Sequence, residues 1–114
     1  MTLTGPAKLV RVHFGEDDRW HGKPLYEAIV EEARRHDLAG ATVYRGIEGY
    51  GASSRIHRQQ LLTSSDLPIV LCLIDTADKI ERFLPTLQSM VQEGLVAISD
   101  VDVIRYTHPK EPHA

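Results

Sequence analysis

Segments with the hydrophobic pattern of strands alternate along this chain with segments that have the hydrophobic pattern of helices. Lys8–Phe14 starts apolar and then alternates between polar and apolar side chains, which indicates a half-buried strand. After a polar stretch that we expect to be a loop, apolar side chains recur at helical spacing from Leu25 to Ala33. Pro24 suits the first helical position, because its missing N–H is not needed there. The pattern therefore predicts a strand, a loop and a helix that stops near Gly40.

The middle of the chain contains two further strand-like segments. Ala41–Arg45 includes Thr-Val-Tyr, which are good strand formers. Pro68–Ile74 is apolar almost throughout, as in a central strand that is covered on both faces, or by a helix and a partner subunit. Between them, Ile47–Leu67 is far longer than the usual hairpin connection of about 2–5 residues.

The last third of the chain predicts a helix and a final strand. Asp75 or Thr76 is placed to cap the helix through a side-chain oxygen. Pro85 lies inside the apolar stripe, so we expect a kink or a split near residues 82–84. Gly94 ends this region, and an alternating strand follows through Val101, Val103 and Tyr106.

The order strand, helix, strand, strand, helix, strand predicts an α+β fold. Two such halves form a ferredoxin-like βαββαβ sandwich, with an antiparallel four-stranded sheet and two helices on one face. The apolar strand 68–74 would leave the second face apolar too, so we expect an oligomer with packed sheet faces. The alternative is a monomer with an exposed apolar face. We expect one domain over residues 1–114, with a core at about 7–106, a long loop at 47–67 and a loose tail at 107–114.

Composition narrows the functional classes. The chain has 114 residues, 13 Lys and Arg against 16 Asp and Glu, and one cysteine. A net charge of −3 does not favour nucleic-acid binding, which needs a basic surface. One cysteine forms no internal disulfide, and no signal peptide is evident, so we expect a cytoplasmic protein. The apolar run at 68–74 is shorter than the roughly 20 residues of a membrane span.

Candidate chemistry is concentrated in the glycine-rich segment Gly40–His57. Gly46, Gly49 and Gly51 permit positive φ and close approach of a ligand, and successive N–H groups there can form an anion-binding nest. The order of the glycines differs from the dinucleotide-binding fingerprint, and no helix opens after them. Positive charge around the glycines comes from Arg45, Arg55, His57 and Arg58.

The length of Ile47–Leu67 has two interpretations. One is a ligand-responsive or partner-binding loop. The other is a hairpin excursion whose strand pairing continues through Arg55–Leu62. The residues alone do not separate these interpretations.

Catalytic and metal-binding patterns are absent from the sequence, so we expect neither an enzyme nor a metal site. The six histidines lack the spacing of a zinc motif. Cys72 lies in the apolar strand and is expected to be a small buried hydrophobe. The acidic cluster Glu16–Asp18 is expected to be a solvated loop. A cavity enclosing His13 and His57 would favour an enzyme instead.

Several of these segments together resemble the bacterial and archaeal family catalogued as domain of unknown function 190. The resemblance runs from about Lys8 to Tyr106. The segments that carry it are Gly22–Val30, Gly40–Gly51, Ile56–His57, Leu67–Pro68, Ile80–Pro85 and Glu93–Val96.

That family is similar in fold to the PII nitrogen-regulatory proteins. This resemblance implies a homotrimer with nucleotide in the clefts between subunits, and a long T-loop that changes shape with ligand and docks onto a transporter or enzyme. Some members are encoded near fluoride channels, which makes a membrane channel a conceivable partner. The base of the T-loop matches Arg45, Gly46, Ile47, Gly49 and Gly51.

One part of the PII pattern is altered here. PII proteins carry a second glycine-rich loop with a lysine after the second helix, but Gln92–Ala97 has one glycine and no lysine. The resemblance therefore implies AMP or another small anion rather than ATP. Arg105 stands near the position of the basic strand residues of PII proteins.

The leading hypothesis is a PII-like signalling protein that binds an adenine nucleotide between subunits and signals through residues 47–67. A partner would be a membrane channel or transporter. The alternatives are a small ferredoxin-like oligomeric enzyme and a structural trimer without a ligand. The candidate ligand-binding residues are Arg45, Gly46, Ile47, Gly49, Tyr50, Gly51, Arg55, His57 and Arg105.

Overall fold

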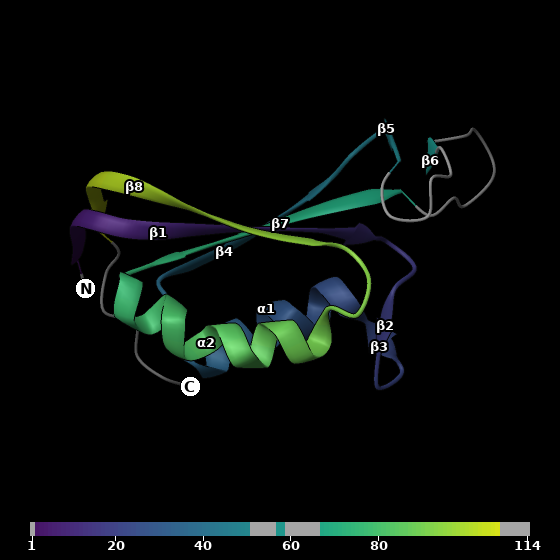
Figure 1. Cartoon of the computed structure of the whole chain (residues 1–114), viewed down its shortest axis with the longest axis horizontal. Coiled ribbons are helices and arrows are strands. Elements are labelled where there is room, and N and C mark those ends of the chain that lie inside the picture. The colour runs from purple at the N-terminus through teal and green to yellow at the C-terminus, as the bar shows by residue number, and fades with distance from the viewer. Residues whose placement is uncertain (1, 51–56, 59–66, 108–114) are drawn as a thin grey trace.

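The computed structural model of the chain describes residues 2–50, 57–58 and 67–107. Its main sheet is antiparallel, with four strands in the order β4-β7-β1-β8. These strands are β1 (Thr2–Gly15), β4 (Gly40–Arg45), β7 (Pro68–Asp75) and β8 (Leu95–Thr107). Helices α1 (Leu25–Arg35) and α2 (Ala77–Met90) both lie against one face of the sheet (Figure 1). The predicted α+β, ferredoxin-like arrangement is confirmed.

Two short hairpins accompany the main sheet, and the first of them was not predicted. The loop expected before α1 contains β2 (Arg19–Trp20) and β3 (Lys23–Pro24), joined by a turn in which His21 and Gly22 have φ of 49° and 84°. Positive φ at both central residues is the geometry that suits a tight hairpin. The second hairpin pairs β5 (Glu48–Gly49) with β6 (His57–Arg58). One of the two interpretations of the long segment, in which strand pairing continues through Arg55–Leu62, includes this pairing at residues 57–58.

The core lies between the sheet and the helices. Along β7, Ile69, Leu71 and Leu73 are buried, whereas the alternate residues Val70, Cys72 and Ile74 are only half-buried. Successive side chains of a strand point to opposite faces, so only every second residue of the apolar run packs into the core. Cys72, predicted to be a small buried hydrophobe, is on the other face and is half-buried in the single chain.

Helix α2 continues through Pro85 as one helix, and the predicted split does not occur. Pro85 lies on the exposed side, while Phe83 and Leu87 on either side of it are buried in the core. Proline removes one backbone hydrogen bond, and the burial of these neighbours holds the helix together across that position. Thr76 is the N-cap and accepts a hydrogen bond from the Lys79 N–H at 3.4 Å, as the sequence indicated.

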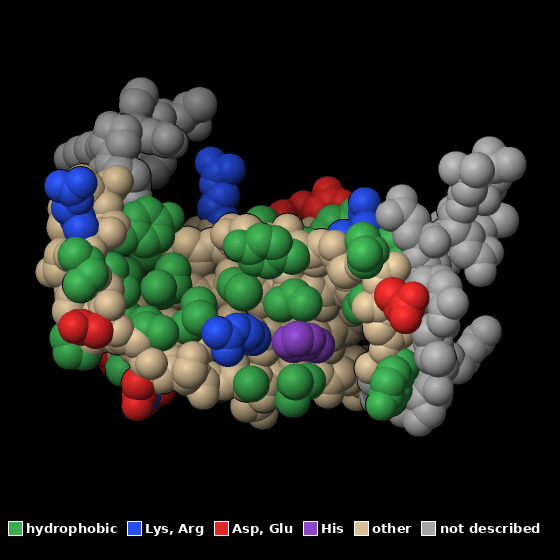
Figure 2. Space-filling model, turned by 90° about the horizontal axis from the view of Figure 1, so that it is seen from above, with side chains coloured by type: hydrophobic (Ala, Val, Ile, Leu, Met, Phe, Trp, Pro, Cys, Tyr) green, Lys and Arg blue, Asp and Glu red, His purple; other side chains and the backbone are tan. Residues whose placement is uncertain are grey.

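Neither described helix lies on the other face of the sheet, which is called the outer face below. Figure 2 looks down on it and shows hydrophobic side chains gathered over the sheet, with histidine and basic side chains among them. Strand register places three cross-strand rows on it: Tyr44, Val70, His13 and Leu95; Thr42, Cys72, Arg11 and Ala97; Gly40, Ile74, Leu9 and Ser99.

Candidate functional site

The base of the long segment is built where β4 ends and β7 begins. The N–H of Gly46 donates to the carbonyl of Pro68 at 2.7 Å. A Cβ on Gly46 would lie 2.8 Å from Cγ of Pro68, and one on Gly49 would lie 3.3 Å from the same atom. These glycines therefore allow two backbone segments to approach closely. Because the Gly46 N–H is already used, an anion-binding nest would have to use the N–H groups that follow it.

Glu16, directly after β1, contacts both ends of the same segment. Its N–H donates to the carbonyl of Leu67 at 2.8 Å, and its carboxylate forms an ion pair with the guanidinium of Arg45. A turn fixes its backbone, because the Gly15 N–H donates to Oδ2 of Asp18 at 3.2 Å and the Asp18 N–H donates back to the Gly15 carbonyl at 3.1 Å. Glu16 is therefore part of the base, although the sequence indicated only a solvated acidic loop there.

Exposed apolar side chains mark the rim of this base. Ile47 and Tyr50 are 74% and 75% exposed, on either side of β5. Strand pairing continues between Glu48 and Arg58 and between Gly49 and His57. Of the other predicted ligand-binding residues in this region, Gly51 and Arg55 lie outside the described residues, and only the strand position of His57 is described.

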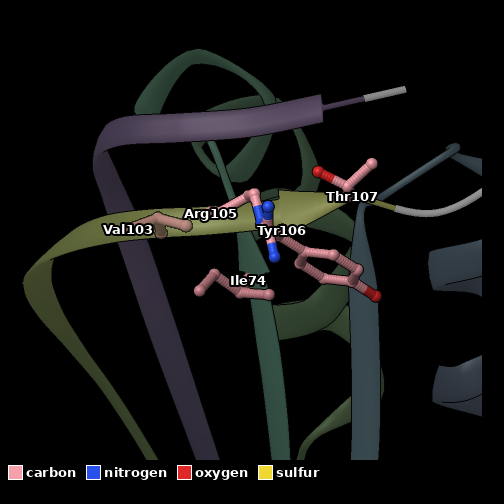
Figure 3. A pocket seen from close by; sticks show the side chains of 5 residues that line it. All are labelled: Ile74, Val103, Arg105, Tyr106 and Thr107. Atoms are coloured by element: carbon pink, nitrogen blue, oxygen red, sulfur yellow. The ribbon is translucent and has the colours of Figure 1, made fainter.

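A second candidate site lies at the opposite end of the sheet. An open pocket of about 690 Å³ is lined by Ile74 of β7 and by Val103, Arg105, Tyr106 and Thr107 of β8. Figure 3 shows the side chains of Arg105 and Tyr106 extending from β8 toward Ile74. The Tyr106 ring lies close over Gly40, where a Cβ would be 3.0 Å from the phenol oxygen. The sequence indicated Arg105 but missed the pocket residues around it.

The guanidinium of Arg105 is exposed and forms no hydrogen bond or ion pair with the part of the chain that the structure describes. Arginine presents a planar fork of donors that suits carboxylate and phosphate groups. Next to an aromatic ring and a threonine hydroxyl, this arginine gives the pocket the chemistry of a site for an anionic ligand with a flat, apolar part.

Arg45 and Arg105 do not meet within one chain. Arg45 and Gly40 are the two ends of β4, and five steps of extended strand span about 17 Å. Arg45 is paired in register with the buried Ile69 and so lies on the helix-covered face, whereas the pocket includes Ile74 of the outer face. The structure therefore divides the predicted ligand-binding residues into two groups, at opposite ends and on opposite faces of the sheet.

Resolved pKa shifts lie away from both groups. A hydrogen bond from Lys8 to Asp100 raises the pKa of Lys8 above 10.5, and a hydrogen bond from Lys23 lowers the pKa of Glu31 below 4.5. Both shifts belong to exposed ion pairs, one joining β1 to β8 and the other joining β3 to α1.

Metal-binding clusters and membrane-spanning helices are both absent from the part of the chain that the structure describes. No set of three or more His, Cys, Asp or Glu side chains is placed to hold a metal ion there. Within the same ranges, no helix is both long and apolar enough to cross a membrane. The pocket at Arg105 contains neither His13 nor His57, so it gives no support to the enzyme interpretation that would require them.

Comparison with known proteins identifies the family. Residues 7–103 match the model of DUF190, described as "Uncharacterized ACR". The chain belongs to the DUF190 family. A UPF0166 protein of Aquifex aeolicus (strain VF5) is 41% identical over 98 residues, which cover 85% of this chain and 92% of that relative. The sequence resemblance to this family is thereby confirmed.

Solved structures with the same fold include PII-like and CutA proteins. CPII, a nitrogen regulatory PII-like protein from Thiomonas intermedia K12 bound to ADP, AMP and bicarbonate, superposes with a TM-score of 0.66 at 17% identity, covering 90% of this DUF190 chain and 91% of CPII. CutA from Synechococcus elongatus PCC7942 gives 0.58 at 11% identity, covering 93% and 85%. At these sequence identities the similarity shows a PII-like, ferredoxin-like fold, and it does not identify a ligand of this chain.

Proposed function

We propose that this DUF190 chain is a cytoplasmic PII-like regulatory protein that binds an adenine nucleotide, or a similar small anion, between its subunits. The observation that carries the proposal is the division of the candidate residues into two groups. The Arg105 pocket of one subunit and the Arg45–Gly49 base of another would together surround one ligand, which neither group can do alone. The ADP and AMP bound by CPII, a protein of the same fold, support the choice of nucleotide.

Association of subunits is the second part of the proposal. The outer face presents Val70, Cys72 and Ile74 half-buried in a single chain, and Tyr44 and Leu95 are more than half exposed. Contiguous apolar surfaces of this kind mark protein contacts. We propose a homotrimer in which the outer faces pack against one another and the edge strands β4 and β8 of neighbouring subunits bring the two groups of residues together.

The connection between α2 and β8 supports AMP over ATP. It contains no lysine or arginine that could neutralise a triphosphate. Its glycine, Gly94, has φ of 150°, and a Cβ there would lie 2.3 Å from the carbonyl oxygen of His13. Close packing against the backbone of His13 is therefore enough to explain why residue 94 is a glycine. The glycine is then no sign of a phosphate-binding loop.

The proposed output is a change in the segment 47–67 that a partner protein reads. Ligand contacts at Arg45 and Gly49 lie directly at the base of this segment. A ligand shifts such an equilibrium only through its different affinities for the two states of the segment. We propose a membrane channel or transporter as the partner.

Calorimetric titration of the purified protein with AMP, ADP, ATP and cyclic AMP tests the nucleotide site. We expect AMP or ADP to bind, and we expect Arg105→Gln to weaken binding at least tenfold with no loss of stability, because this side chain is exposed and unpaired among the described residues. Arg82→Gln, on the exposed side of α2, is the matched control and should bind like the wild type. Absence of heat with every nucleotide would refute the proposed ligand.

A further inference from the structure

One ion pair occupies a residue that the proposed ligand needs. Arg45 is the basic side chain at the base of the long segment, and its guanidinium already contacts the carboxylate of Glu16. The pair crosses β7, since β4 and β1 lie on either side of that strand. The side chain of Glu16 is 22% exposed and that of Arg45 is 55% exposed, so water and solutes reach the arginine more easily than its partner.

Glu16 is held in place independently of this ion pair. Its N–H donates to Leu67, and the turn between Gly15 and Asp18 fixes its backbone through two further hydrogen bonds. Because the backbone of Glu16 is already fixed, little backbone conformational entropy is lost when its carboxylate contacts Arg45. Ion pairs this open to solvent are weak, so an anion with more charge than a carboxylate can exchange with Glu16.

We propose that Glu16 is an internal competitor for Arg45: its carboxylate occupies the guanidinium until an anionic ligand displaces it. This inference rests on the proposed nucleotide site and adds a regulatory contact to it. When the ligand takes Arg45, β4 loses its side-chain contact with the end of β1, while the backbone contact from Glu16 to Leu67 stays. Ligand binding thereby changes the attachment of one end of the 47–67 segment only.

The test is a calorimetric titration of Glu16→Gln with AMP. Glutamine keeps the shape of the side chain and removes the charge, so AMP should bind about two- to fivefold more tightly than to the wild type. Glu81→Gln removes the same charge from the exposed side of α2 and should leave the affinity unchanged. Equal or weaker binding by Glu16→Gln would overturn the competition.

A measurement on the wild type tests the same proposal even if the Glu16→Gln variant does not fold. With ¹³C-labelled glutamate, the Glu16 carboxyl resonance should shift as AMP is added, and an unmoved resonance at saturating AMP would overturn the proposal. The two proposals fail in different ways. No AMP binding by either the wild type or Glu16→Gln contradicts both, whereas normal wild-type binding with an unchanged Glu16→Gln affinity contradicts the competitor alone.

Discussion

Asp75 shows how one side chain fixes the pocket end of the sheet. Among the described residues it is the charged side chain that is fully buried, at 1% exposure. Its carboxylate accepts hydrogen bonds from the N–H groups of Ala39 and Thr76, each at 2.7 Å, and lies 3.3 Å from Nζ of Lys79. It therefore joins the start of β4 to the start of α2, beside Ile74 of the Arg105 pocket.

Asp75→Asn should destabilise the protein by about 2–3 kcal/mol. The NH₂ group of asparagine would face a backbone N–H group that needs an acceptor, and Lys79 would lose its buried counter-charge. Urea unfolding followed by circular dichroism measures this. Asp78→Asn, whose partner Arg82 is exposed, should change stability by less than about 0.5 kcal/mol. Similar losses for both variants would show that burial at Asp75 is not important.

Residue-level chemistry was predictable from the sequence only where neighbours in the chain carry it. The glycines at 46 and 49 and the charge of Arg45 stand in one segment, and the sequence indicated them. The contact between Glu16 and Arg45 depends on strand order, with β7 between their strands, and no local pattern contains it. Likewise, Tyr106 meets Ile74 and Gly40 only because the end of β8 lies across them.

Whole elements were predicted where the hydrophobic period is long and uninterrupted. Strand β7 and both helices follow their periods closely. Strand β1 begins six residues before the predicted start, because pairing with β8 extends it, with a register shift between Leu3 and Gly5 and with Pro6 paired to Asp102. Strand β8 starts at Leu95, ahead of the alternating segment predicted around Val101, because its first residues also pair with β1, beginning with Leu95 opposite His13.

The turn from α2 into β8 gives a prediction about glycine. Gly94→Ala should cost about 3 kcal/mol, because a Cβ would stand 2.3 Å from the His13 carbonyl oxygen at a φ of 150°. Gly22→Ala is the matched control: its φ is 84°, but nothing lies within 4 Å of the added atom, so about 1 kcal/mol is expected. Thermal unfolding of the two variants checks the order, and a larger loss at Gly22 would contradict it.

The whole molecule has two unlike sheet faces, and the proposed function depends on the one without helices. Its rows combine apolar side chains with Arg11 and His13, neither of which forms a hydrogen bond or ion pair within the described part of the chain. If copies of this face pack together as proposed, the contact has to accommodate Arg11, which lies in the middle of the three rows, as well as the apolar side chains. The sequence indicated such a face from the apolar run at 68–74, but not its basic residues.

Val70→Asp should dissociate the assembly without unfolding the chain. Val70 lies between Tyr44 and His13 on the outer face, where a carboxylate is tolerated in water and strongly disfavoured in an apolar contact. Sedimentation velocity should give three times the chain mass of 12.8 kDa for the wild type and the single-chain mass for the variant. Gln88→Asp on the exposed side of α2 should stay assembled, and a monomeric wild type would rule out association through this face.

The central claim is that one ligand is held by Arg45 of one subunit and Arg105 of another. It is tested most directly by AMP titration of oligomers assembled from equal amounts of Arg45→Ala and Arg105→Ala chains. Each variant alone should fail to bind. In mixed oligomers, random assembly should give both arginines to about a quarter of the clefts, which should bind AMP with wild-type affinity. Mixed oligomers that bind no AMP, from a wild type that does, would place the site within a single chain and contradict the account.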